Sequence, residues 1–179
     1  ALNQVITNVY DKNRRLSAVA NPLGQRSTFG YDVAGNRTSV QDALGFVATT
    51  TYGALGGVSE QIDTLGQRTS FTYDAVGRQR SVQDATAAVT TTSYDTVGRV
   101  VSTQDARGSV TTQSYDAAGR LRTVQDAEGF TSTYSFDAAG RVRTQQDALG
   151  RVTTYGFDAA GNQVSVQNAL GSVTTSVFD

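Results

Sequence analysis

Apolar and polar residues alternate along the whole chain in short segments of about six or seven residues. Arg120–Gln125 (RLRTVQ) and Arg151–Phe157 (RVTTYGF) are two of these segments, and both are rich in Val, Thr, Tyr and Arg. Such a length and composition are typical of β-strands. Residues rich in Asp and Gly separate the segments, and no stretch has a helical period. The pattern therefore predicts an all-β fold.

The pattern repeats every 21 residues without insertion or deletion. One aromatic residue, here called the anchor, begins each repeat and is followed by Asp in all but one case. These pairs are Tyr10-Asp11, Tyr31-Asp32, Tyr52-Gly53, Tyr73-Asp74, Tyr94-Asp95, Tyr115-Asp116, Phe136-Asp137, Phe157-Asp158 and Phe178-Asp179. A fixed period of this size marks a repeat architecture. Each repeat is too small to fold alone, so neighbouring repeats must supply the missing stabilisation.

Two copies of the turn signal D-x-x-G occur in each repeat. Asp in a type I turn bonds its side chain to backbone amides ahead of it, and the Gly takes the positive φ that a G1 bulge requires. The first turn follows the anchor, and the second turn begins ten residues later. The turn residues that we single out are Asp32, Gly35, Asp116 and Gly119 for the first turn, and Asp42, Gly45, Asp126, Gly129, Asp147 and Gly150 for the second.

Each repeat should therefore be a β-hairpin, and successive hairpins should continue one curved antiparallel sheet. The anchors that pack this sheet are predicted to be Tyr31, Tyr73, Tyr94, Tyr115, Phe136 and Phe157. Val47, Val89, Val110, Val152 and Val173 fall on the opposite face unless a bulge shifts the phase. The sheet is then either covered on both faces, or bulges redirect one set of side chains.

Charge and composition exclude several classes of partner. The net charge is −1, which favours neither nucleic acid nor an anionic membrane as a partner. The chain has no Cys, so no disulfide stabilises it. It also has no apolar run long enough to span a membrane.

Catalysis and metal binding have little support in the residues. The chain has no His and no Cys, which removes the commonest bases, nucleophiles and soft metal ligands. Turn formation explains every periodic Asp, and the spacing matches neither the EF-hand loop nor the G-G-x-G-x-D nonapeptide of calcium-binding repeats. We therefore predict no catalytic residue, no metal site and no cofactor.

Three further rows allow more than one interpretation. The Thr row that includes Thr111 and Thr153 fits plain β-propensity, with ice binding as the alternative. Arg after the first-turn Gly, as at Arg120, could pair with the turn Asp of its own or of the next repeat. The anchors could stack on sugars, but buried packing beside the turn is the better explanation.

The motif Y-D-A-A-G-R-L at Tyr115–Leu121, with D-A-L-G-R-V-T-T-Y at Asp147–Tyr155, resembles the YD repeat. That repeat occurs in bacterial Rhs proteins, in the large subunits of insecticidal toxin complexes and in teneurins, and the resemblance covers the whole chain. It implies hairpins joined edge to edge into a strip that spirals into a hollow shell, often around a toxic C-terminal domain. Other members lie on cell surfaces.

Some positions depart from the pattern. Arg14 replaces the Gly of one first turn, Gly53 replaces an Asp, and the second turn at Asp84–Ala87 has no Gly. Pro22 is the only proline, so nothing matches the Pro-rich self-cleaving motif of many family shells.

From these observations we expect residues 1–179 to be a single array of about eight repeats and a fragment of a longer array. The predicted function is the non-catalytic wall of a hollow β-shell in a secreted toxin-type protein. The alternative is an extracellular filament, tube or cell-surface adhesin. The expected partners are flanking repeats of the same chain or identical chains, together with an encapsulated C-terminal toxin domain. The expected location is extracellular or at the cell surface.

Overall fold

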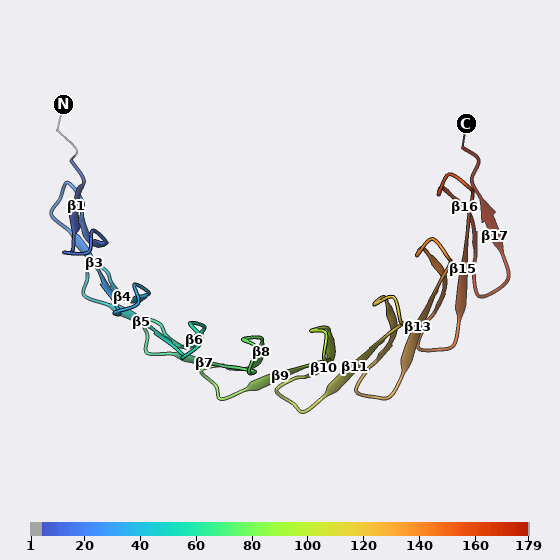
Figure 1. Cartoon of the computed structure of the whole chain (residues 1–179), viewed down its shortest axis with the longest axis horizontal. Coiled ribbons are helices and arrows are strands. Elements are labelled where there is room, and N and C mark those ends of the chain that lie inside the picture. Colours follow the sequence, from blue (N-terminus) through green and yellow to red (C-terminus); the bar gives the residue numbers. More distant parts are fainter. Residues whose placement is uncertain (1–4, 179) are drawn as a thin grey trace. The chain divides into compact units, whose positions relative to one another are not determined.

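The computed structural model describes residues 5–178, which form only strands and turns (Figure 1). Ala1–Gln4 and Asp179, the last Asp of the repeat pattern, lie outside the described residues. The odd-numbered strands are β1 (Thr7–Tyr10), β3 (Arg26–Tyr31), β5 (Val47–Tyr52), β7 (Arg68–Tyr73), β9 (Val89–Tyr94), β11 (Val110–Tyr115), β13 (Thr131–Phe136), β15 (Val152–Phe157) and β17 (Val173–Thr175). The even-numbered strands are β2 (Leu16–Ala20), β4 (Arg37–Gln41), β6 (Val58–Ile62), β8 (Gln79–Gln83), β10 (Val100–Gln104), β12 (Leu121–Gln125), β14 (Val142–Gln146) and β16 (Gln163–Gln167).

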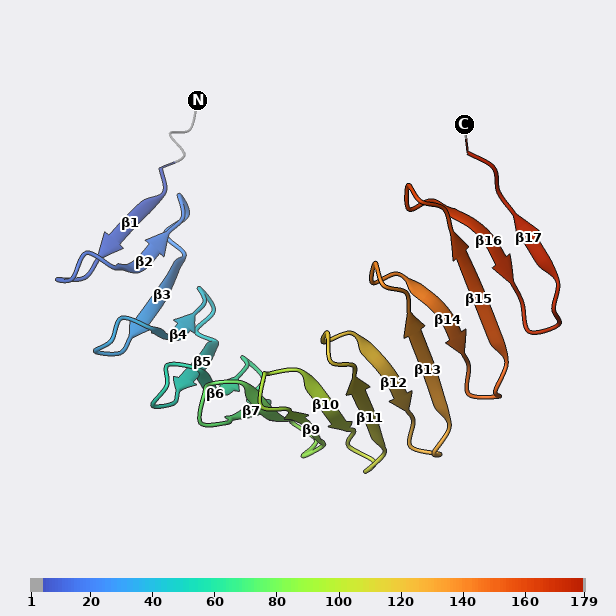
Figure 2. The same cartoon turned by 45° about the vertical axis from the view of Figure 1, so that its right-hand side comes forward.

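The chain consists of two compact units, divided between Thr90 and Thr91. In the first unit, each strand from β1 to β8 pairs antiparallel with the next strand in sequence. In the second unit, the same holds from the Thr91–Tyr94 part of β9 to β17 (Figure 2). The predicted all-β fold of tandem hairpins is therefore confirmed within each unit. No helix long and apolar enough to cross a membrane occurs among residues 5–178.

Both turns of a repeat have the same backbone structure. In the first turn, the amide of Asp116 donates to the carbonyl of Arg120, and the amide of Gly119 donates back to the carbonyl of Asp116, both at 2.9 Å. The second turn repeats this pattern from Asp126 to Phe130 at 3.0 and 3.1 Å. The turn glycines have φ between 77° and 95°. These bonds and angles define a type I turn followed by a G1 bulge.

The two turns differ in what happens to the register beside them. Next to the first turn, Ser114 lies opposite Thr123 but Tyr115 lies opposite Leu121, so Arg122 is an extra residue in β12. The same shift occurs beside every described first turn, and no shift accompanies the described second turns. The bulge brings Leu121, and three residues later Val124, onto the face that carries Tyr115. Bulges therefore redirect the apolar side chains of the even-numbered strands toward the anchors.

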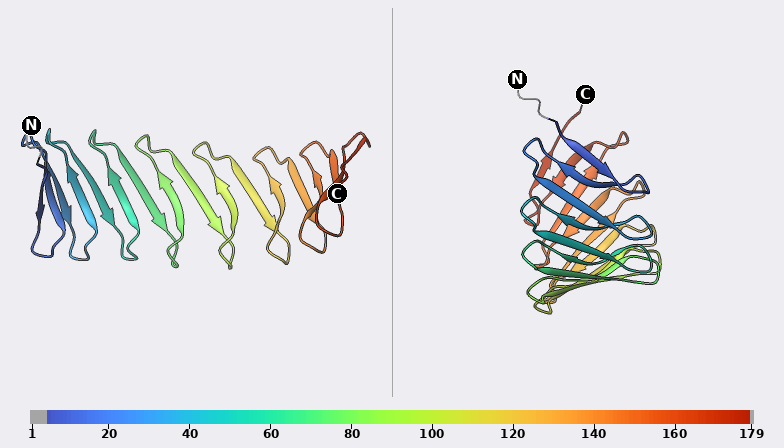
Figure 3. Two further views of the ribbon diagram at one scale, coloured as in Figure 1. Left: turned by 90° about the horizontal axis from the view of Figure 1, so that it is seen from above. Right: turned by 90° about the vertical axis from the view of Figure 1, so that its left-hand side faces the viewer.

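Neither face of the sheet is covered within the described part of each unit. The strands of a unit form one layer (Figure 3), and Ala18 is the one buried hydrophobic residue among residues 5–178. The valine row opposite the anchors is 37–57% exposed; it consists of Val47, Val89, Val110, Val152 and Val173. Of the two alternatives, the one that residues 5–178 display is redirection by bulges, and no second layer of this chain covers either face. Contacts between neighbouring strands and turns must stabilise the layer instead.

Two turns adopt the left-handed conformation without glycine. Arg14 has φ 61° and Ala87 has φ 66°, and both turns keep the backbone hydrogen bonds of the others. Side chains with a Cβ are strained in this region, whereas Gly is not. The period of the array therefore dictates the backbone even where the residue opposes it.

Replacing Ala87 with Gly should raise the free energy of unfolding by about 1 kcal/mol, because the strain of the left-handed conformation disappears. Chemical denaturation followed by circular dichroism measures this change. The matched control is Gly108→Ala, at the same turn position of the next repeat, where φ is 87° and a new Cβ would approach other atoms no closer than 3.8 Å. That variant should lose a similar amount. A destabilised Ala87→Gly protein would contradict the assignment of strain.

Candidate functional site: the contacts between neighbouring repeats

The turn carboxylates accept hydrogen bonds from the backbone ahead of them. In the first turn, Oδ1 of Asp116 accepts from the amides of Ala118 and Arg120, both at 2.9 Å. In the second turn, Oδ1 of Asp126 accepts from the amides of Glu128 and Phe130 at 3.1 and 2.9 Å. The carboxylates of Asp32, Asp42 and Asp147 lie in equivalent positions with amide bonds of 2.9–3.0 Å. Each of these carboxylates thus organises its own turn.

The second carboxylate oxygen of the first turn binds an arginine of the same turn. Nε of Arg120 donates to Oδ2 of Asp116 at 2.7 Å, and both side chains are about two thirds or more buried. The same ion pair, at 2.6–2.8 Å, joins Arg15 to Asp11, Arg78 to Asp74, Arg99 to Asp95 and Arg141 to Asp137. Of the two partners that the sequence left open, the carboxylate of the same repeat is the one that the arginine pairs with.

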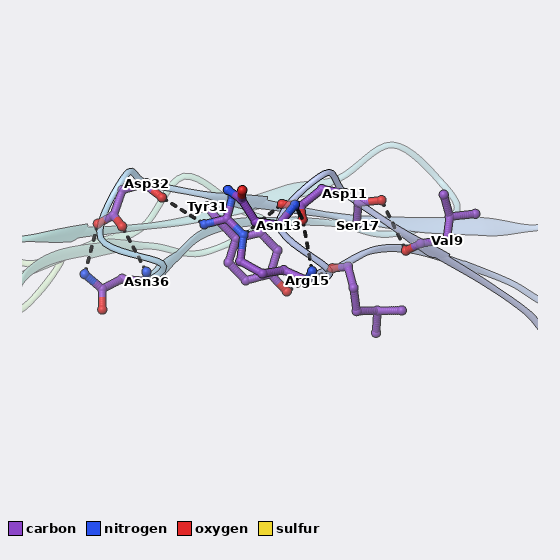
Figure 4. Close-up of polar contacts among 9 residues, drawn as sticks. Val9, Asp11, Asn13, Arg15, Ser17, Tyr31, Asp32 and Asn36 are labelled. Carbon is purple, nitrogen blue, oxygen red and sulfur yellow. Dashed lines mark hydrogen bonds and ion pairs between the residues drawn. The ribbon is translucent and has the colours of Figure 1, made fainter.

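The same arginine also reaches the next repeat. The guanidinium carbon of Arg120 lies 4.4 Å from the centre of the Phe136 ring, and its Nη1 lies 3.4 Å from the carbonyl oxygen of Asp137. Figure 4 shows the equivalent contacts of Arg15, which pairs with Asp11 and donates to the carbonyl of Asp32 at 3.0 Å. The other rings so contacted are Tyr31 by Arg15, Tyr115 by Arg99 and Phe157 by Arg141, at 4.4–4.6 Å. We call this series of Asp, Arg and next anchor the turn-edge ladder.

Tyrosine anchors add a second bond between repeats. The hydroxyl of Tyr115 donates to the carbonyl of Val100, in the preceding repeat, at 2.8 Å. Tyr31 and Tyr73 make the same bond to Leu16 and Val58 at 2.9 and 2.8 Å. Phe136 and Phe157 have no hydroxyl, so at those anchors the arginine contact is the main side-chain link along this edge. The anchor Tyr94 is half-buried like the others.

A glutamine that the sequence analysis did not single out stabilises the second turn. Nε2 of Gln104 donates to the carbonyl of Gly108 at 3.2 Å. The same bond, at 3.1–3.4 Å, is made by Gln41, Gln83, Gln125, Gln146 and Gln167. The recurrence of Gln immediately before the second-turn Asp was the signal that could have identified it.

The charge state of the first-turn carboxylates follows from these bonds. The pKa of Asp116 lies below its usual value of 3.8 because the backbone amide of Arg120 donates to the carboxylate and because the guanidinium binds it, while partial desolvation opposes the shift. The pKa of Asp32 is lowered first by the side-chain hydrogen bond from Asn36. No group of three or more His, Cys, Asp or Glu side chains that could hold a metal occurs among residues 5–178. The chemistry of these carboxylates is that of turn acceptors.

Comparison with known proteins identifies the class. A family model described as RHS Repeat matches residues 10–47, 94–133 and 136–173, which is more than half of the chain. The chain therefore belongs to the RHS repeat family, as the Y-D-A-A-G-R-L motif predicted. Among curated proteins, none matches the chain.

Two solved structures share the fold. The crystal structure of TcdB2-TccC3-TEV is 16% identical with a TM-score of 0.50, over 91% of this chain and 11% of that chain. The crystal structure of TcdB2-TccC3 is also 16% identical with a TM-score of 0.50, over 91% of this chain and 12% of that chain. At this identity the likeness concerns the fold alone. The present chain spans only about a tenth of the length of those chains.

Replacing Arg120 with Ala should lower the free energy of unfolding by about 1–2 kcal/mol, because one ion pair and one cation–π contact disappear. Equilibrium chemical denaturation of the chain, followed by circular dichroism, measures the loss. The matched control is Arg122→Ala, the exposed bulge residue two positions further on, which should change stability by less than about 0.5 kcal/mol. Equal losses for the two variants would show that the ladder arginine has no special role.

Acid should weaken the first turns. Because the pKa of Asp116 is lowered by folding, its stabilisation is complete above its usual pKa of 3.8 and is lost as the pH falls through the lower folded value. The variant Asp116→Asn keeps a side-chain oxygen that accepts from the backbone amides of the turn but loses the charge. Asn168 naturally accepts two such bonds at 3.0 Å. The stability advantage of the wild type over this variant should shrink between about pH 5 and pH 2. Thermal unfolding at several pH values tests this, and an advantage independent of pH would contradict it.

Proposed function

We propose that this chain is a non-catalytic structural segment of the wall of a hollow β-shell in a secreted toxin-type protein. The observation that carries the proposal is the turn-edge ladder, in which one arginine binds the carboxylate of its own repeat and the ring and carbonyl of the next. Such contacts extend a sheet repeat by repeat without requiring a second layer. Membership of the RHS repeat family and the fold shared with TcdB2-TccC3 support the same conclusion.

The residues support a structural rather than a catalytic role. The chain has no His and no Cys, and the first-turn carboxylates are occupied by backbone amides and arginine. In this proposal the anchors Tyr31, Tyr73, Tyr94, Tyr115, Phe136 and Phe157 hold successive repeats together. The turn residues Asp32, Gly35, Asp42, Gly45, Asp116, Gly119, Asp126, Gly129, Asp147 and Gly150 set where the chain reverses.

The proposed partners are flanking repeats of the same chain or identical chains, and a C-terminal toxin domain enclosed by the wall. The proposed location is extracellular or at the cell surface. Uncovered faces support the need for such partners, since a sheet whose valines are 37–57% exposed on one face gains stability when another surface covers it.

One observation favours a second candidate, an extracellular filament or surface adhesin built from the repeats themselves. The repeat length is 21 residues throughout, and the same register shift recurs in both units. Uniform repeats of this kind suit an array that extends by adding equal units.

Electron microscopy of the native protein that contains this chain distinguishes the two candidates. The shell proposal predicts closed hollow particles of one size, and mass measurement should then reveal enclosed polypeptide. Long tubes or fibres of constant width would replace the shell with the filament. Solid particles without an interior would contradict both.

A further inference from the structure

The turn-edge ladder does not run evenly along the first unit. After the anchor Tyr31, Asn36 stands at the position of the ladder arginine. Its backbone amide donates to Asp32 at 2.9 Å, and its side-chain Nδ2 donates to Asp32 at 3.0 Å (Figure 4). An asparagine side chain is three bonds shorter than a guanidinium arm, so it serves its own turn only. The ring of the next anchor, Tyr52, therefore receives no cation–π contact from position 36.

The following junction lacks both partners of the ladder. Gly53 supplies no carboxylate, so the turn is closed by two backbone bonds, Gly53 to Gly57 at 2.8 Å and Gly56 to Gly53 at 2.9 Å. Gly57 stands at the arginine position. A Cβ added there would lie 3.0 Å from Cζ of Tyr73, because the ring packs directly against the glycine backbone.

Tyrosine hydroxyls give each of these two junctions one hydrogen bond in place of the charged contact. The hydroxyl of Tyr52 donates to the carbonyl of Arg37 at 3.1 Å in an exposed position, and that of Tyr73 donates to the carbonyl of Val58 at 2.8 Å. Arg68 pairs with Glu60 at 2.8 Å, but it joins β6 to β7 away from the first turns, and its side chain is 62% exposed. Exposed ion pairs contribute little to stability.

The second unit has no such gap between Arg99 and Phe157. Arg99, Arg120 and Arg141 occupy three consecutive repeats, and each lies over the ring of the next anchor at 4.4–4.5 Å. The β5–β6 and β13–β14 hairpins therefore share a period and a backbone but differ in the side chains that link them to their neighbours.

We propose that the stretch from Asp32 to Tyr73 is a built-in opening point, at which the β5–β6 hairpin separates from its neighbours before the β13–β14 hairpin of the second unit does. The stability of a repeat array is approximately a sum of repeat terms and nearest-neighbour terms. Two successive junctions without ladder contacts lower the nearest-neighbour terms on both sides of one hairpin. Such a hairpin opens locally while the rest of its unit stays folded. The inference concerns the array itself and holds whichever structure the array builds.

Hydrogen exchange of the intact chain, read by mass spectrometry, tests the proposal. Peptides covering residues 47–62 should exchange roughly two- to fivefold faster, after correction for intrinsic rates, than peptides covering residues 131–146. The second segment occupies the same repeat positions and has a ladder arginine on each side, whereas the first has only a tyrosine hydrogen bond on each side. Equal protection of the two segments would overturn the proposal.

Two reciprocal substitutions make the test specific to the ladder arginine. Asn36→Arg restores the arginine beside Asp32 and should slow exchange of residues 47–62 roughly two- to fivefold, the effect of one exposed cation–π contact. Arg120→Asn reproduces the natural Asn36 arrangement in the second unit and should speed exchange of residues 131–146 by a similar factor. Each variant is the control for the other, since it should leave the other segment unchanged. If Asn36→Arg fails to slow residues 47–62, or if both segments respond to both variants, the opening point does not lie at these junctions.

Discussion

The contact between the first turn of one repeat and the aromatic anchor of the next is the interaction on which the rest of this sheet depends, and in most repeats an arginine makes it. With Ala18 the one buried hydrophobic residue among residues 5–178, the sheet has no layer that could stabilise it by burial. Backbone ladders hold neighbouring strands together, but they tolerate slippage when both faces are open. Arg120, placed 4.4 Å from the Phe136 ring while bound to Asp116, links two turns at a defined spacing. The ladder thus replaces part of what a core does in a globular domain.

The register shift beside the first turn determines which side chains share the face of the anchor. Without the extra residue Arg122, strict alternation would place Leu121 and Val124 on opposite faces. With it, both lie on the face of Tyr115. The anchors therefore share their face with apolar side chains of the even-numbered strands, whereas the other face carries the valine row of the odd-numbered strands together with Thr and Ser. Hydroxyl pairs such as Ser114 with Thr123, at 2.6 Å, occupy that second face.

Much of this could be predicted from the sequence because the turn chemistry is local. Asp116 and Gly119 determine a turn through bonds within five residues, and the 21-residue period then defines every strand. The number of layers could not be predicted, because Val110 has the same β-propensity whether a second sheet covers it or water does. The reach of Arg120 to the next repeat depends on the twist between hairpins, which no single repeat encodes. Gln104 was missed because a polar residue beside a turn has no distinctive pattern until the repeats are compared position by position.

The most direct test of this account is a double-mutant cycle between Arg120 and Phe136, with Arg120→Ala, Phe136→Leu and the double variant compared by equilibrium unfolding. Leucine keeps most of the apolar bulk of the anchor but removes the ring face. The account predicts a coupling free energy of about 0.5–1 kcal/mol between the two positions. Additive losses, with no coupling, would mean that the arginine stabilises only its own turn and that the repeats are held together by something other than the ladder.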